Sequence, residues 1–156
     1  MPFSYVDFMT ELMAAKKYPS QPNFDPPRLT PLRRPIAEST IGLFTSAGVQ
    51  LRTEPLLAET NDLSYRLVDR EVSPTELVVA HQTPVRHWAL EDLNVAYPRD
   101  RLVELEQEKT IGHLAPRAVS MVGSISQYTE LLQRTVPAIK EEFDSQGVDL
   151  VFLFPF

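Results

Sequence analysis

The chain has 156 residues, the length of one ordinary domain. Hydrophobic residues make up 43% and charged residues 23%, a balance typical of a folded globular protein and not of a disordered tail. Fifteen basic against twenty-one acidic residues give a formal charge of −6, which argues against a nucleic-acid-binding protein with its basic face. The sequence has no apolar stretch of about 18 residues that could cross a membrane.

The chain contains no cysteine, which excludes disulfides, thiolate metal ligands and thiol nucleophiles from these 156 residues. The N-terminus, Met1 to Asp7, places an acid before any base and has no long apolar core. It does not resemble a secretory signal, so we expect a cytoplasmic protein.

We predict two regions, an N-terminal helix and proline-rich arm over residues 1–36 and an α/β domain over 37–156. Apolar residues at helical spacing predict a short amphipathic helix over 4–17, at Val6, Met9, Leu12 and Met13. Seven of the fourteen prolines fall in the first 35 residues, so residues 18–36 cannot hold a regular helix or a central strand. The basic residues of this arm are either solvated or pinned to an acidic surface: Arg28, Arg33 and Arg34.

From residue 40 onward, apolar β-rich segments alternate with amphipathic segments. The predicted strands are 40–45, 63–68, 76–81, 118–122 and 148–154. The predicted helices are 100–109 and 128–143, the second with a kink at Pro137. This order is typical of an α/β fold with a mostly parallel sheet and helices on both faces, in a Rossmann-like three-layer arrangement.

Parallel sheets bind ligands beyond the carboxyl ends of their strands, and polar residues stand at those ends here. We expect five of them to approach one another at one edge of the sheet and to bind a small molecule: Thr45, Ser46, His81, Asn94 and Ser120. The segment 45–48 could offer hydroxyls and backbone N–H groups to an anion, or could be a plain turn after a strand. His81 could act as a proton donor or as a hydrogen-bond partner.

Two further polar groups have alternative interpretations. Asp92 and Asn94 could bind an ammonium group, but residues of these types also cap helices and form turns. The three histidines do not have the spacing of a zinc site, so we expect no metal. The chain also lacks the glycine-rich fingerprint of a dinucleotide site.

A series of short motifs follows a recognisable order along the chain. They are Pro31-Leu32-Arg33-Arg34-Pro35, Thr45-Ser46-Ala47-Gly48, Asp62-Leu63-Ser64-Tyr65-Arg66, His81, Asp92-Leu93-Asn94-Val95-Ala96-Tyr97-Pro98, Asp100-Arg101-Leu102-Val103-Glu104-Leu105, Ile111-Gly112, Ser120-Met121-Val122-Gly123-Ser124 and Gly147-Val148-Asp149-Leu150-Val151. Together they resemble the selenoprotein B family of glycine/sarcosine/betaine reductases, which is related to the D-proline reductase selenoprotein. The resemblance covers roughly residues 30–156 and depends on the order of the motifs, since none of them is specific alone.

The resemblance implies an oxidoreductase that cleaves a C–N bond with a dithiol/disulfide couple. In that family a selenocysteine or cysteine opens a U-x-x-C or C-x-x-C motif directly after the last apolar strand, where a helix N-terminus stabilises the anion. This chain stops at Phe156, where the motif would begin, so it carries no catalytic redox residue and His81 is at most auxiliary. The resemblance implies no visible cofactor in this chain and a selenocysteine in the full-length protein. It implies a small-molecule substrate and, as partners, other reductase subunits or a thiol reductant. A homo-oligomer is a further possibility.

Two functions from different classes remain open. The chain is either the substrate-handling part of such a reductase or a non-catalytic α/β module for small-molecule binding or assembly. Residues 148–154 are so apolar that we expect them inside the sheet, covered on both faces. An α-carboxylate of a chain ending at Phe156 would lie beside this buried strand, and an uncompensated charge there is costly. We therefore expect the domain 37–156 to be incomplete and the polypeptide to continue.

Overall fold

The structure is a computed structural model that describes residues 11, 25–26 and 30–156. The predicted helix 4–17, apart from Glu11, and much of the predicted arm 18–36 lie outside the described residues. Within the described part of that arm, the Nε atom of Arg34 lies 3.5 Å from Oδ1 of Asp149, so one of its arginines contacts an acidic residue of the domain.

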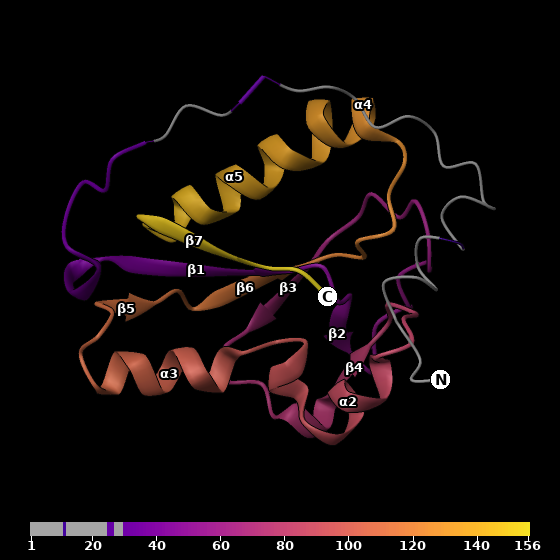
Figure 1. Ribbon diagram of the computed structural model, residues 1–156, viewed down its shortest axis with the longest axis horizontal. Coiled ribbons are helices and arrows are strands. Elements are labelled where there is room, and N and C mark those ends of the chain that lie inside the picture. Colours follow the sequence, from indigo (N-terminus) through magenta and orange to yellow (C-terminus); the bar gives the residue numbers. More distant parts are fainter. Residues whose placement is uncertain (1–10, 12–24, 27–29) are drawn as a thin grey trace.

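The described residues form a mixed α/β fold (Figure 1). The strands are β1 Thr40–Thr45, β2 Val49–Leu51, β3 Arg66–Asp69, β4 Leu77–Val79, β5 His113–Leu114, β6 Arg117–Ser120 and β7 Leu150–Phe154. The helices are α2 Arg86–Glu91, α3 Arg99–Gln107, α4 Tyr128–Glu130 and α5 Val136–Ser145. Shorter helical turns are η1 Ile36–Glu38, η2 Pro74–Glu76, η3 Leu93–Val95 and the π-helical η4 Leu131–Thr135.

Strand β1 is the centre of a curled, mostly parallel sheet. Along one side it pairs in parallel first with β5 and then with β6, and along the other side it pairs in parallel with β7. Strand β3, within the predicted strand 63–68, pairs with β6 in the antiparallel direction and forms one edge. The parallel pairing delivers the carboxyl ends of β1, β6 and β7 to the same end of the sheet.

Helices pack on both faces of this sheet (Figure 1). On one face, Leu43 of β1 packs in a cluster with Leu102 of α3. On the other face, Phe44 packs against a cluster that contains Phe143 of α5. A Cβ atom at Gly42 would lie 2.7 Å from the Phe143 ring, so the glycine permits the close approach of α5 to β1.

The predicted helix 128–143 is present as the continuous stretch from α4 through η4 to α5. It departs from α-helical geometry in the π turn η4, which ends two residues before Pro137. Pro137 lies in the first turn of α5, where its missing N–H group disturbs the helix least. The predicted irregularity is therefore real, and it lies just before the proline.

The predicted strand 76–81 does not join the main sheet. Its core, β4, pairs in the antiparallel direction with β2 in a separate two-stranded sheet. The chain reaches β2 from β1 through Gly48, whose φ of 64° is a left-handed conformation that favours glycine. Because β4 pairs with β2 and not with a strand of the main sheet, the expectation that 76–81 belongs to the mostly parallel sheet is wrong.

The last strand is also not placed as predicted. Among the described residues, β7 pairs with β1 alone, and its outer side has no strand beside it. Phe152 is 42% exposed and Leu153 is 67% exposed. The expectation that this strand is covered on both faces is therefore wrong for the described part of the chain.

An ion pair connects β3, α3 and β5. Nη2 of Arg70 lies 2.7 Å from Oε2 of Glu106, and Nη1 of Arg70 donates to the carbonyl of Leu114 at 2.9 Å. Glu106 Oε1 accepts from the backbone N–H of Leu114 at 3.0 Å. The Arg70 hydrogen bond, more than any other cause, lowers the pKa of Glu106, although burial opposes it.

We expect E106Q to reduce the free energy of unfolding by about 1–3 kcal/mol, because Arg70 and the Leu114 N–H lose a charged acceptor. Since the pKa of Glu106 is lowered on folding, this stabilisation is present above the unfolded value near 4.3 and is lost as pH falls. Urea unfolding at pH 7 and pH 3 measures both effects. The matched control is E104Q, whose exposed i,i+3 pair with Arg101 contributes little.

Candidate functional site

The polar residues at the ends of β1 and β6 lie side by side. Thr45 and Ser120 are register partners in the parallel pair. Val119 packs on the α5 face, so Ser120, the next residue along the strand, points to the α3 face. Both Thr45 and Ser120 are fully buried. The structure therefore brings together two hydroxyls that the sequence assigns to one site.

Thr45 anchors the segment that precedes α3. Its Oγ1 donates to the carbonyl of Ala96 at 2.6 Å and accepts from the backbone N–H of Ala47 at 3.2 Å. Because Ala96 lies between η3 and α3, this contact fixes the loop above the carboxyl end of β1.

Ser46 lies at the junction of β1, β7 and the loop after β6. Its Oγ accepts from the backbone N–H of Phe156 at 2.9 Å, and its own N–H donates to the carbonyl of Phe154 at 3.2 Å. The N–H of Gly123 donates to the Ser46 carbonyl at 3.0 Å. A Cβ at Gly123 would lie 3.1 Å from the Ser46 Cβ, so this loop approaches closely because the residue is glycine.

His81 reaches the same end of the sheet from β4. Its backbone N–H donates to the carbonyl of Ala47 at 3.1 Å, one residue beyond Ser46. Its Nδ1 atom is buried and has no hydrogen-bond partner among the described residues. Burial lowers the pKa of His81, which favours the neutral imidazole.

Three buried polar side-chain atoms of the described residues have no hydrogen-bond partner, and all three belong to this region. They are Nδ1 of His81, the hydroxyl of Tyr97 and Oγ of Ser120. Tyr97 directly follows Ala96, the acceptor for Thr45, and only 2% of its surface is exposed. Buried polar groups are normally paired, so these three unpaired atoms mark a candidate binding site. Ser120 ends the parallel strand β6, whereas His81 follows the antiparallel strand β4 and Tyr97 precedes α3.

Tyr97 is the residue that sequence reasoning missed. It appears in the sequence within an apolar segment before a proline, where an aromatic residue is ordinary. Its significance comes from its burial beneath the start of α3 and from the charge nearby, since the Cζ atom of Arg99 lies 6.0 Å from its ring centroid. Burial raises the pKa of Tyr97, so the hydroxyl keeps its proton at neutral pH and can donate it in a hydrogen bond.

Asp92 and Asn94 are used in local contacts. Asp92 is exposed, and its Oδ1 accepts from the backbone and side-chain nitrogens of Asn94 at 2.9 and 3.0 Å. Asn94 Oδ1 in turn accepts from the N–H of Asp100, in the first turn of α3. The two residues thus cap η3 and the start of α3 rather than projecting free groups, and they join the site through Ala96.

Two general findings complete the description of the site. Within the described ranges, no three histidine, aspartate or glutamate side chains converge to hold a metal ion. None of the helices described is both long and apolar enough to cross a membrane. The described residues thus form an α/β protein with three unpaired buried polar atoms, which lie after β4, before α3 and at the end of β6.

Comparison with known proteins relates the chain to one reductase subunit. No protein-family model and no solved structure matches the chain. It is 27% identical over 148 residues to D-proline reductase subunit gamma from Acetoanaerobium sticklandii. The alignment covers 93% of this chain and 61% of that subunit, so the chain spans less than two thirds of its relative. The chain is a distant homologue of a reductase subunit.

Removal of the Thr45 hydroxyl and removal of the Tyr97 hydroxyl should have different effects on the free energy of unfolding. T45V loses the bonds to Ala96 and Ala47, so we expect a loss of about 1–3 kcal/mol in the free energy of unfolding. Y97F removes a hydroxyl without a partner, so it should be neutral or stabilising. Denaturant unfolding of both variants is the measurement. A loss of more than about 1 kcal/mol in Y97F would show that its hydroxyl is paired.

His81 should make the stability of the protein depend on pH. Its pKa is lower in the folded protein than the unfolded value near 6.5, so the unfolded state binds more protons as pH falls through that value. We therefore expect the wild type to lose stability from pH 7.5 to pH 5.5, and H81Q to lose less. Urea unfolding at both pH values tests this, and equal losses in the two proteins would contradict it.

Proposed function

We propose that this chain is the substrate-handling part of a selenol- or thiol-dependent reductase that cleaves a C–N bond. The observation that carries the proposal is the distant homology to D-proline reductase subunit gamma over nearly the whole chain. The finer proposal is a protein of the glycine/sarcosine/betaine reductase selenoprotein B type. It includes a Rossmann-like arrangement of the complete fold and a cytoplasmic location.

The 156 residues contain no cysteine, so the redox group must come from outside them. When present, a selenol or thiol would supply the electron pair for reductive cleavage and would be oxidised together with a second thiol. The proposed group is selenocysteine or cysteine, with other reductase subunits or a thiol reductant as partners. The carboxyl end of β7 supports a location near Ser46, because the Phe156 N–H is already bonded to its hydroxyl.

The polar cluster fits a small substrate that carries a carboxylate and an amine. The hydroxyls of Ser120 and Tyr97 can each donate a hydrogen bond to a carboxylate oxygen, and both lack a partner. Neutral His81 can accept a hydrogen bond from an ammonium group, or hold a proton that the departing nitrogen requires. Tyr97 and Ser120 are buried, which limits the access of water to their hydroxyls.

A binding or assembly module without catalysis is the second candidate, and the absence of cysteine favours it. Isothermal titration of the 156-residue chain with D-proline, glycine, sarcosine and betaine addresses the polar cluster. Binding that S120A weakens, with no weakening in the exposed control S126A, places the ligand at this cluster under either candidate. The redox test below then separates the reductase from the module.

The reductase proposal predicts a redox group in the native assembly. An antibody against residues 30–156 should isolate, from the native source, a protein or complex with selenium or an alkylatable thiol. With a dithiol as reductant, this material should consume one of the substrates. The same assembly with the H81Q variant of this chain should have a kcat/KM lower by about tenfold or more. The control H87Q changes an exposed histidine and should retain activity. Native material without selenium, thiol or turnover would leave the binding module as the function.

A further inference from the structure

A groove of about 340 Å³ lies between β4 and α2, which are neighbours in Figure 1. Its lining includes Leu77, Val79 and Ala89, all of them buried. Two arginines, Arg52 and Arg86, line the same groove. Pockets for small molecules have volumes of this order and combine an apolar lining with a few polar groups.

A backbone carbonyl holds each of these arginines in place. Nε of Arg52 donates to the carbonyl of Thr75 at 2.9 Å, and Nε of Arg86 donates to the carbonyl of Val79 at 3.1 Å. Thr75 precedes β4 and Val79 is its last residue, so the two guanidinium groups are fixed near opposite ends of the strand. The Nη atoms of each arginine still carry N–H donors for another acceptor.

No carboxylate of the described residues neutralises these two arginines. Most other arginines in that part of the chain form ion pairs, as Arg70 does with Glu106. Neither Arg52 nor Arg86 has an ion pair, or a second hydrogen bond, with a described residue. Two uncompensated cations thus line one groove of a chain whose net charge is −6. Their remaining donors are available to an anion from outside the described residues.

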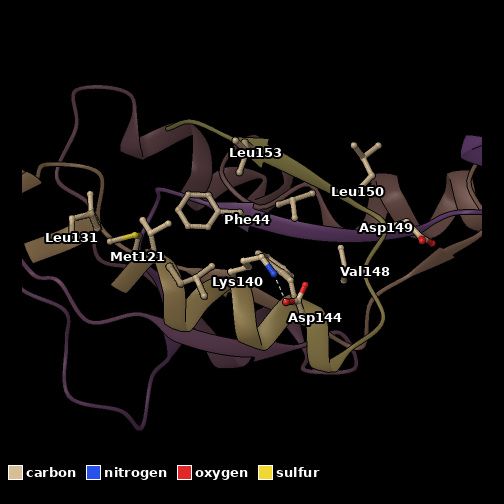
Figure 2. A pocket seen from close by; sticks show the side chains of 13 residues that line it. Phe44, Met121, Leu131, Lys140, Asp144, Val148, Asp149, Leu150 and Leu153 are labelled. Atoms are coloured by element: carbon tan, nitrogen blue, oxygen red, sulfur yellow. Dashed lines mark hydrogen bonds and ion pairs between the residues drawn. The ribbon is translucent and has the colours of Figure 1, made fainter. Parts of the chain in front are cut away.

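The larger groove between β7 and α5 does not share this property. It has a volume of about 490 Å³ and a mostly apolar lining (Figure 2). Its charged residues Lys140 and Asp144 form an ion pair with each other, and Asp149 contacts Arg34. The charges of that groove are therefore compensated within the chain, whereas those beside β4 are not.

We propose that the groove between β4 and α2 binds a small organic anion. A carboxylate or phosphate group of the ligand would accept from the Nη atoms of Arg86, since a guanidinium donates in pairs to such oxyanions. The apolar body of the ligand would lie against Leu77 and Val79. Arg52, near the other end of β4, adds positive charge to the same groove.

One acidic residue opposes this binding and therefore provides a test of its sign. Glu91 also lines the groove and forms no ion pair with a described residue. Its negative charge repels an anion, so its neutralisation should strengthen binding of an anion and weaken binding of a cation.

Backbone-amide NMR titration of the 156-residue chain with benzoate and with phenyl phosphate tests the proposal. At least one of these probes should bind with a Kd of about 1 mM or lower and shift the signals of β4 and α2. Benzamide has the same apolar ring without the charge, and it should bind at least about tenfold more weakly. The probes also distinguish a carboxylate from a phosphate as the preferred group.

Matched variants test the residues that carry the proposal. R86Q should weaken binding by about tenfold, whereas the control R134Q changes an exposed arginine on η4 and should have no effect. Since R86Q also alters a contact of β4, E91Q gives a second measurement. It should strengthen binding about two- to fourfold, and the control E141Q on α5 should not. Circular dichroism verifies that all variants are folded.

The result does not depend on turnover or on a redox group, so it is independent of the proposed function. S120A should leave the binding of either probe unchanged, which separates this groove from the polar cluster. The proposal is overturned if neither anion shifts β4 and α2 at 10 mM, if benzamide binds as tightly, or if R86Q and R134Q have equal effects. Weaker binding of the anion by E91Q would also overturn it.

Discussion

The structure depends on the need of β1 to satisfy its backbone on two sides while both of its faces are buried. An unpaired N–H or C=O group in that position is costly, so β1 requires a strand on each side along its length. Strand β7 supplies one side, and β5 and β6 in turn supply the other. All three neighbours are parallel to β1, so the ends of β1, β6 and β7 and the loops beyond them meet at one place. The candidate site is a consequence of how β1 is paired.

Local patterns in the sequence predict the parts of this arrangement that depend on local residues. Residues 40–45 form β1 as predicted, and the predicted helix 100–109 corresponds to α3. In both cases the pattern of apolar residues within one segment determines the structure. The gathering of Thr45, Ser46 and Ser120 also follows from sequence, because parallel strands deliver their ends to one edge.

The positions of β4 and β7 could not be predicted, because they depend on distant partners. Strand β4 has the composition of a buried strand, but its partner β2 turns away from the main sheet at Gly48. Strand β7 has the composition of an interior strand. Its own residues do not determine whether a second strand pairs with its outer side, and none of the described residues does so. The burial of Tyr97 could not be predicted for the same reason, because it depends on the packing of α3 in the same cluster.

Among the described residues, the buried side-chain nitrogen and oxygen atoms without a hydrogen-bond partner belong to His81, Tyr97 and Ser120. Each such group costs about 1–3 kcal/mol, against a total stability of about 5–15 kcal/mol for a typical domain. A fold that needed only stability could place apolar residues at positions 97 and 120, as it does at Val119 and Val122 beside them. The two unpaired hydroxyls are therefore the observation on which the proposed ligand site depends.

The end of β7 is tied directly to the site. Phe154 and Phe156 pack against the α3-side cluster, and the N–H of Phe156 is bonded to Oγ of Ser46. The N–H of Ser46 in turn donates to the carbonyl of Phe154. The position of the last strand and the geometry around Ser46 therefore depend on the same two hydrogen bonds, and the pairing of β7 with β1 sets both.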